Sequence, residues 1–321
     1  MPKFVFMPPQ DELKRQFASR LADTLPDYDV QSPETDEEAI EEIKDADAAM
    51  GWIPPEALKT AGKMKWLHNP DSGPFFGYYY EDLCKHPMTI TNPRGIYWDH
   101  ISHHILMFVL ALSRGLPWYE KARQDRVYDK SVRKSPYIYL GNSVALINGV
   151  GGIGHETARL LTEFGVKVIG IDPRPEYQVE GMEIYPPEKL QELLPKADFV
   201  ITTVPHTPVT EFTFKAETFG LMKDTAYFIN IGRGMVCKID DLANAIESGD
   251  IAGCGLDVYE VEPLPADHKL WGLDNVLMTP HVAIVDAENI PERRFEILLD
   301  NAKSFLSGEN LKNVVDKETW Y

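Results

Sequence analysis

The chain has 321 residues, of which 44% are hydrophobic, and its 50 acidic and 32 basic side chains give a formal net charge of −18. This length favours two domains, and this charge argues against binding to nucleic acid or to an anionic membrane surface. The three cysteines are widely spaced and form no CxxC pair, which argues against a disulfide framework or a thiolate zinc site. The longest apolar run, at 105–112, is too short to span a membrane. We therefore expect a cytoplasmic protein.

Short β-type runs alternate with helical patterns through the first hundred residues. The expected strands are KFVFM, YDVQ, ADAAMGW, MKWLHN and MTITN, and the expected helices lie at 11–25, at 32–49 and from Pro55 onward. The stretch at 32–49 is strongly acidic, which would suit a partner-binding tail, but Ala39, Ile43 and Ala46 recur at helical spacing and favour a solvated helix. Strand–helix alternation of this kind predicts a parallel sheet with helices on both faces.

A long helical stretch at 98–124 leads into a second series of strands and helices. Its expected strands are NSVALINGV, VKVIGID, DFVITTV, AYFINI, AGCGLDV and NVLM. The last helical pattern, at about 287–307, follows this series and is expected to pack back on the first domain. The sequence thus predicts an α/β protein of two doubly wound parallel-sheet domains, Rossmann-like or flavodoxin-like, with a cleft between them. The expected boundaries are 1–98 plus 288–321 for one domain and 99–287 for the other.

The second series opens with a glycine motif. Gly149, Gly151 and Gly154 form G-x-G-x-x-G between an apolar strand and a helical pattern, where glycines let the backbone approach a pyrophosphate at a helix N-terminus. Asp172 ends the next strand about 20 residues on, where its carboxylate can bind the adenosine ribose and would repel a 2′-phosphate. Arg174 could instead attract that phosphate. The pattern predicts dinucleotide binding and favours NAD, with NADP as the alternative.

Three further turns hold the remaining candidates: NIGRG holds Arg233, LDVYEVEP holds Asp257 and Glu262, and TPH holds His281. Following the glycine motif in this order, they resemble the D-2-hydroxyacid dehydrogenase family, which includes glyoxylate/hydroxypyruvate reductases and phosphoglycerate dehydrogenases. The resemblance extends over about 140–283. It implies an NAD(P)-dependent oxidoreductase that transfers a hydride between nicotinamide C4 and a 2-oxo acid or D-2-hydroxy acid. The first domain would bind substrate and the second the dinucleotide.

The resemblance also implies a role for each residue. His281 would be the general acid and base, because imidazole titrates near neutral pH and the reduced carbonyl oxygen needs a proton. Glu262 would hold the other ring nitrogen, Arg233 would bind the substrate carboxylate, and Asp257 would bond the nicotinamide carboxamide. The other expected cofactor contacts, besides His281, are Gly152, Ile153, Val204, Pro205 and Ile231. Each residue also has a purely structural alternative. His281 could be a hydrogen-bonded histidine at a strand end, Arg233 and Glu262 could form a surface ion pair, and Asp257 could cap a strand end.

Resemblance is weaker in the first domain. Ser72 and Gly73 match the family loop whose backbone amides bind the substrate carboxylate, but Pro74 replaces the usual valine and lacks an N–H. The aromatic residues at 75–80 are then either core or pocket. In the pocket, they would suit a larger substrate or narrow the site for a glyoxylate-sized acid.

The start of the long helix also departs from the family pattern. Its histidines His100, His103 and His104 have the spacing for a metal site, but no further ligand completes one and the reaction needs no metal, so we predict none. Trp98 and His100 are candidate substrate contacts instead. Family members typically pair as homodimers through the arm after this helix, here 115–140. One alternative is a dinucleotide-sensing regulator without catalysis. A formate-oxidising relative is disfavoured, because that subgroup has glutamine at the position of Glu262.

Overall fold

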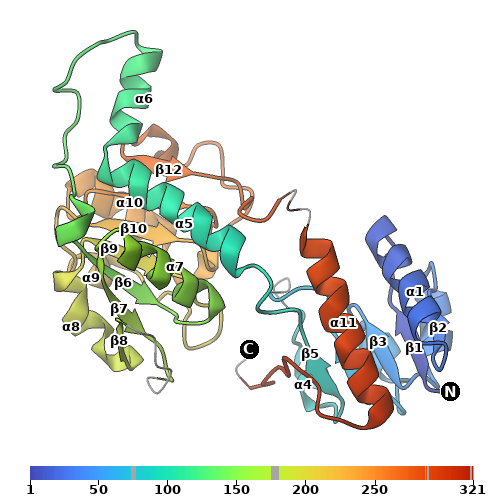
Figure 1. Ribbon diagram of the computed structural model, residues 1–321. Helices are drawn as coiled ribbons and strands as arrows, with labels where there is room; N and C mark the ends of the chain where they lie inside the picture. Colours follow the sequence, from blue (N-terminus) through green and yellow to red (C-terminus); the bar gives the residue numbers. More distant parts are fainter. Residues whose placement is uncertain (74–76, 175–180, 286, 288, 319, 321) are drawn as a thin grey trace. The chain divides into compact units, whose positions relative to one another are not determined.

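The computed structural model describes residues 1–73, 77–174, 181–285, 287, 289–318 and 320 (Figure 1). The chain divides into two compact units: unit 1 is Met1–Ile96 with Ala287–Tyr321, and unit 2 is Tyr97–Asp286. These boundaries fall two residues before the first expected boundary and one before the second. Trp98 therefore belongs to unit 2, whereas the sequence placed it in the first domain.

Unit 1 is built on a five-stranded parallel sheet in the order β2-β1-β3-β4-β5, the flavodoxin-like arrangement. Its strands are β1 (Lys3–Phe6), β2 (Asp29–Gln31), β3 (Ala48–Met50), β4 (Trp66–His68) and β5 (Thr89–Thr91). Its helices are α1 (Glu12–Thr24), α2 (Asp36–Ile43), α3 (Pro55–Leu58), α4 (Glu81–Lys85) and α11 (Asn289–Ser307). The acidic stretch forms α2, with Ala39 and Ile43 buried beneath its solvated face.

Both faces of the unit 1 sheet are buried, because successive side chains of β1 enter different clusters. Phe4 packs on the face covered by α1 and α11, whereas Val5 packs with residues of α2 and α3. Phe17 of α1 and Phe295 of α11 lie with ring centroids 5.3 Å apart, and the Tyr28 hydroxyl donates to Ala302 O at 2.9 Å. Helix α11 thus completes the core of unit 1, although the whole of unit 2 lies between α11 and the rest of unit 1 in the sequence.

Unit 2 holds a seven-stranded parallel sheet in the order β12-β11-β10-β9-β6-β7-β8. Its strands are β6 (Val144–Asn148), β7 (Lys167–Ile171), β8 (Glu183–Tyr185), β9 (Phe199–Thr202), β10 (Tyr227–Asn230), β11 (Gly253–Leu256) and β12 (Val276–Met278). Its α-helices are α5 (Trp98–Ser113), α6 (Leu116–Gln124), α7 (Gly152–Glu163), α8 (Leu190–Leu193), α9 (Ala216–Phe219) and α10 (Ile239–Ser248). The strand order reverses between β6 and β9, which is where doubly wound sheets bind ligands.

The two faces of this sheet are covered by different helices (Figure 1). Phe199 and Ile201 of β9 pack with residues of α5 and α7, whereas Val200 packs with residues of α8, α9 and α10. None of the described helices is long and apolar enough to span a membrane. The two predicted parallel-sheet α/β domains are confirmed.

The structure differs from the expected elements of unit 2 in two places. The long helical stretch is broken into α5 and α6 at Gly115, whose φ is 69°, with a proline opening the second helix. Strand β8 was not expected, because its three residues carry no apolar run. In the structure they lie at the edge of the sheet and are at least partly exposed. Short edge strands leave little pattern for sequence reasoning.

His68 on β4 should make unit 1 sensitive to acid. Its side chain is buried, its Nδ1 lies 2.9 Å from Thr91 Oγ1, and burial lowers its pKa from 6.5 to about 3. At a pH between these two pKa values, His68 is protonated in the unfolded chain but not in the folded chain. The contribution of the neutral side chain to the free energy of unfolding is therefore fully present above pH 6.5 and is lost as the pH falls. Lowering the pH from about 7 to about 5 should reduce the free energy of unfolding of the wild type by about 2 kcal/mol more than that of His68→Asn. Urea unfolding at the two pH values measures this difference. Equal losses would contradict this assignment.

Candidate active site

The glycine motif joins β6 to α7 at the point where the strand order reverses. The Gly149 N–H donates to Ile171 O at 2.8 Å, which ties the turn to the neighbouring strand. Helix α7 begins at Gly152, and among the described residues no side chain caps its N-terminus. The N–H groups of its first turn therefore face outward, as an anion such as a pyrophosphate requires. The β carbon of Trp98 lies 3.7 Å from where Gly152 would carry one, so Trp98 borders this loop.

Asp172 links the glycine turn to the segment after β7. Its carboxylate is buried, and its Oδ2 accepts from the Val150 N–H at 3.0 Å. Its Oδ1 accepts from the backbone N–H and from the Nε of Arg174, both at 3.0 Å. The two residues that the sequence set in competition over the cofactor ribose are thus paired with each other.

The expected contacts on the β9 side surround the same turn. The Thr203 hydroxyl donates to Gly149 O at 2.8 Å, next to Val204, and Pro205 O accepts from the Thr210 hydroxyl at 2.7 Å. Ile231 follows β10 and is 5% exposed. Its side chain belongs to the core cluster on which Ile153 also packs.

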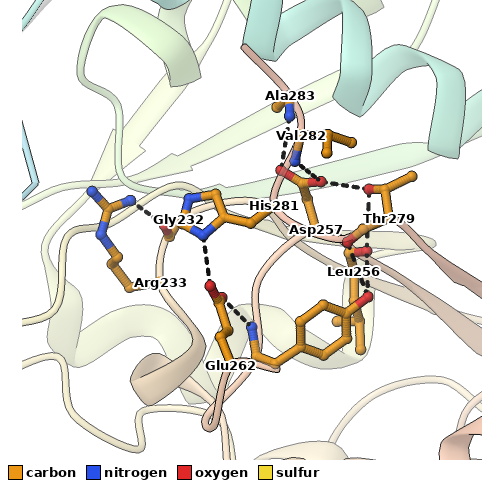
Figure 2. Close-up of polar contacts among 10 residues, drawn as sticks. Gly232, Arg233, Leu256, Asp257, Glu262, Thr279, His281, Val282 and Ala283 are labelled. Atoms are coloured by element: carbon orange, nitrogen blue, oxygen red, sulfur yellow. Dashed lines mark hydrogen bonds and ion pairs between the residues drawn. The ribbon is translucent and has the colours of Figure 1, made fainter. Parts of the chain in front are cut away.

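Arg233 lies in the turn that follows β10. Asn230 holds this turn from both sides, accepting from the Gly232 N–H and donating to Arg233 O, each at 3.1 Å. The Nη1 of Arg233 donates to Gly232 O at 2.7 Å (Figure 2). A β carbon at Gly234 would lie 1.7 Å from Tyr259 O, so the turn packs backbone against backbone on the turn after β11. Only glycine permits this approach.

His281 and Glu262 form the central pair of the site (Figure 2). The Nδ1 of His281 lies 2.8 Å from Glu262 Oε2, and Glu262 Oε1 accepts from the Tyr259 N–H at 2.9 Å. The carboxylate is thus fixed by the backbone of its own turn and in turn fixes the ring. The His281 side chain is 47% exposed in this structure, so a small molecule can reach it.

Asp257 holds the backbone next to His281. Its side chain is 2% exposed, its Oδ1 accepts from the Thr279 hydroxyl at 2.5 Å and from the Val282 N–H at 2.9 Å, and its Oδ2 accepts from the Ala283 N–H at 3.1 Å (Figure 2). His281 itself has φ of 56°, the left-handed region that costs a residue with a β carbon roughly 1 kcal/mol. The bonds to Asp257 offset that cost, because they fix the two following amides.

Sequence reasoning missed two residues, Thr279 and His104, of the hydrogen-bond network around Asp257. Thr279 was quoted only as part of the TPH turn, and His104 was considered only as a metal ligand. In the structure His104 Nε2 lies 2.9 Å from Thr279 Oγ1. Nothing local announces this contact, since the two residues are 175 positions apart. His103 is exposed, and within the described residues no group of three or more His, Cys, Asp or Glu side chains could hold a metal ion.

The expected substrate loop lies in unit 1. Ser72 and Gly73 follow β4, and the preceding Asp71 is bound by Arg294 of α11, with Nη2 and Oδ1 3.0 Å apart. Pro74, Phe75 and Phe76 lie outside the described residues. In unit 2, the main-chain N–H of His100 donates to Asp99 Oδ1 at 2.9 Å, at the start of α5.

Of the three described tyrosines of the aromatic stretch, Tyr78 belongs to the unit 1 core, and Tyr79 and Tyr80 are partly buried against it. Tyr78 is 2% exposed and its hydroxyl donates to Gly51 O at 2.5 Å, and the Tyr80 hydroxyl donates to Ile53 O at 2.8 Å. Tyr79 accepts from the Asn69 amide at 3.2 Å. Burial supports the core interpretation for Tyr78.

Comparison with known proteins assigns the family. A family model described as the NAD-binding domain of D-isomer-specific 2-hydroxyacid dehydrogenases matches residues 106–283, more than half of the chain. A glyoxylate reductase of Thermofilum pendens is 32% identical over 299 residues, which cover 89% of this chain and 86% of the relative. The chain belongs to the D-isomer-specific 2-hydroxyacid dehydrogenase family.

Other members of the family show the same kinship. A D-isomer-specific 2-hydroxyacid dehydrogenase of Xanthobacter autotrophicus, in complex with NADPH and MES, superimposes with a TM-score of 0.84 at 27% identity, covering 100% of this chain and 99% of the other. D-3-phosphoglycerate dehydrogenase of Methanocaldococcus jannaschii is 28% identical over 304 residues, 93% of this chain and 57% of the relative. The predicted resemblance is confirmed, and the protein is an NAD(P)-dependent D-2-hydroxyacid dehydrogenase.

Gly234→Ala tests the packing of the arginine turn. Because the added β carbon would overlap Tyr259 O, the backbone must shift, and we expect about 2 kcal/mol lower stability and an activity loss of at least about tenfold. Urea unfolding and steady-state kinetics measure the two effects. Gly272→Ala is the matched control, since outside its own turn no atom of the described residues lies within 4 Å of the added β carbon. Similar behaviour of both variants would show that the close approach at Gly234 does not matter.

Proposed function

We propose that this dehydrogenase reduces a 2-oxo acid to the corresponding D-2-hydroxy acid, with His281 as the proton donor. The observation that carries the proposal is the 2.8 Å contact of His281 Nδ1 with Glu262 Oε2. The carboxylate accepts the Nδ1 proton, so Nε2 is the nitrogen that faces the reacting oxygen. His281 is half-exposed, and the Glu262 carboxylate that orients it is itself held by the Tyr259 N–H. Acid–base catalysis needs such an arrangement.

The chemistry needs a hydride and a proton on opposite atoms of one carbonyl. When bound, the nicotinamide supplies the hydride at its C4, and it takes the hydride back in the reverse direction. His281 gives its Nε2 proton to the substrate oxygen as negative charge develops there, and the Glu262 carboxylate stabilises the ring while it is protonated. In the oxidation direction, the same nitrogen removes the hydroxyl proton.

Arg233 is proposed to bind the substrate carboxylate. Its guanidinium offers paired N–H donors that match a carboxylate, and its turn is packed directly against the turn that holds Glu262. The carboxylate and the reacting carbonyl would then be oriented by neighbouring turns. The amides of Ser72 and Gly73, in unit 1, are proposed to bind the same carboxylate. Trp98 and His100, in unit 2, are proposed as further pocket residues.

The cofactor site is proposed to follow the glycine motif. Gly149, Gly151, Gly152, Ile153 and Gly154 would cradle the pyrophosphate, and Val204, Pro205 and Ile231 would flank the cofactor along β9 and β10. Asp257 has acceptor capacity left on Oδ2 for the nicotinamide carboxamide, because that oxygen accepts only the Ala283 N–H among the described contacts. Asp172 and Arg174 would meet the adenosine ribose and favour NAD.

The first substrate to test is glyoxylate. The relative from Thermofilum pendens and that from Pyrococcus furiosus, which is 30% identical over 88% of this chain, are both named glyoxylate reductase. Tyr78 is buried in the unit 1 core and Tyr79 and Tyr80 are partly buried against it, so the described rings of this stretch give no observation in favour of an enlarged pocket. A small 2-oxo acid therefore fits the present observations best.

The protein is also proposed to be a cytoplasmic homodimer that pairs through the arm at 115–140. The arm projects from unit 2 as α6 and then returns toward the sheet (Figure 1). It exposes large apolar side chains by 48% to 99%, namely Leu116, Val127, Tyr128, Tyr137 and Tyr139. Such a cluster suits a protein contact.

His281→Ala should abolish reduction without abolishing cofactor binding. We expect kcat for glyoxylate, hydroxypyruvate and pyruvate to fall by about 10²- to 10⁴-fold, because the proton donor is lost. NADH oxidation measures turnover, and NADH fluorescence measures binding, which should change little. His103→Ala, an exposed histidine of the same unit, is the control and should keep full activity. If NADH binds but neither the wild type nor the variant turns over any 2-oxo acid, the sensing interpretation replaces the enzymatic one.

Asp172→Ser should move cofactor preference toward NADPH. The wild type should use NADH better, and the variant should shift the ratio of kcat/KM values by at least about tenfold, since a close negative charge is removed and Arg174 is released. Adding Arg174→Ala should cancel the gain with NADPH. An unchanged ratio in Asp172→Ser, with unchanged melting temperature, would show that this carboxylate does not select the cofactor.

A further inference from the structure

Helix α5 lies unusually close to strand β11. A β carbon at Gly255 would be 2.7 Å from Cγ of Phe108, so the ring of Phe108 packs directly on the strand backbone. His104 lies one turn earlier on the same face, and its ring meets that of Phe108 edge-on, with centroids 4.9 Å apart at 82°. This packing brings His104 to the carboxyl ends of β11 and β12, where Asp257 and Thr279 lie.

A chain of hydrogen bonds runs from His104 to Asp257. The Thr279 hydroxyl oxygen lies 2.9 Å from His104 Nε2 and 2.5 Å from Asp257 Oδ1. An ionised carboxylate only accepts, so the single hydroxyl proton of Thr279 goes to Asp257. The hydroxyl oxygen must then accept from His104, and Nε2 must carry a proton.

The state of the His104 ring follows from its surroundings. Burial lowers its pKa below the ordinary value, although the Asp257 charge, 3.7 Å from Nε2, opposes this effect. The ring is therefore neutral near pH 7, with its proton on Nε2 and none on Nδ1.

We propose that His104 is a positioning residue that directs Thr279 toward Asp257 and so holds the backbone of the catalytic turn. The proposal rests on the proposed function of His281 and Asp257. Without the donor at Nε2, the Thr279 hydroxyl could turn and accept from elsewhere, because Leu256 O, 3.5 Å away, offers it a competing acceptor. Asp257 would lose its shortest bond.

Two consequences for the active site follow from that loss. Asp257 Oδ1, bonded by Thr279 and the Val282 N–H, fixes which way the carboxylate faces and leaves Oδ2 toward the carboxamide. Asp257 also fixes the amides of Val282 and Ala283, which keep His281 in its left-handed conformation. A rotated Asp257 would therefore weaken cofactor binding and misplace the proton donor together.

The test uses two matched pairs of variants. His104→Phe keeps the ring but removes the donor, whereas His104→Gln places an amide N–H near the position of Nε2. Thr279→Val keeps the shape but removes the hydroxyl, whereas Thr279→Ser retains it. We expect the Phe and Val variants to lose at least about tenfold in kcat/KM and to bind NADH more weakly, and the Gln and Ser variants to stay within about threefold of the wild type. His103→Phe, on the exposed face of the same helix, should match the wild type.

Several outcomes would overturn the proposal. Wild-type kinetics in His104→Phe would remove any positioning role, and equal damage in His104→Gln would reduce it to packing. If the His104 variants do not fold, the Thr279 pair decides the question in the same way. Side-chain ¹⁵N NMR gives a readout independent of activity: a wild-type His104 that is protonated on Nδ1 at neutral pH would contradict the chain. Full turnover in His281→Ala would instead refute the proposed function, while the NMR result would still stand.

Discussion

The buried carboxylate of Asp257 is the constraint around which the site of unit 2 is organised. The Asp257 side chain is 2% exposed, and leaving its carboxylate without donors in the protein interior would cost several kcal/mol. Three donors compensate for it: the Thr279 hydroxyl and the amides of Val282 and Ala283. Because two of these donors are main-chain amides just after His281, compensating the buried charge also shapes the turn that carries the His281 ring.

The convergence of the other groups follows from strand order. Arg233 follows β10, Asp257 and Glu262 follow β11, and His281 follows β12, which are three adjacent strands of a parallel sheet. The carboxyl ends of parallel strands meet at one edge, so turns far apart in sequence become neighbours. The register pairs Asn230 with Leu256 and Leu256 with Met278, which brings the three turns level. The strand order and register of the sheet thus bring the charged side chains of the three turns together.

Sequence reasoning was weakest where contacts are not local. The position of Trp98 beside Gly152 depends on how α5 packs on α7, and the break at Gly115 competes with a helical pattern that continues on both sides. The aromatic stretch could not be divided between core and pocket, because apolar composition is the same in both. The structure decides the matter for Tyr78, which is 2% exposed and whose hydroxyl donates to Gly51 O in the unit 1 core.

The sequence by itself determined the two α/β domains, the dinucleotide motif and the three ordered turns, because strand periodicity, glycine spacing and polar residues at strand ends are all local signals. Its motifs also predicted roles for Arg233, Glu262 and His281. Only the tertiary structure decided which side chains join α11 to α1, such as Phe295 beside Phe17, that Asp172 pairs with Arg174 and that His104 reaches Thr279. Each of these depends on the three-dimensional placement of particular atoms, and hydrogen bonds act over about 3 Å, a scale that composition and spacing do not encode.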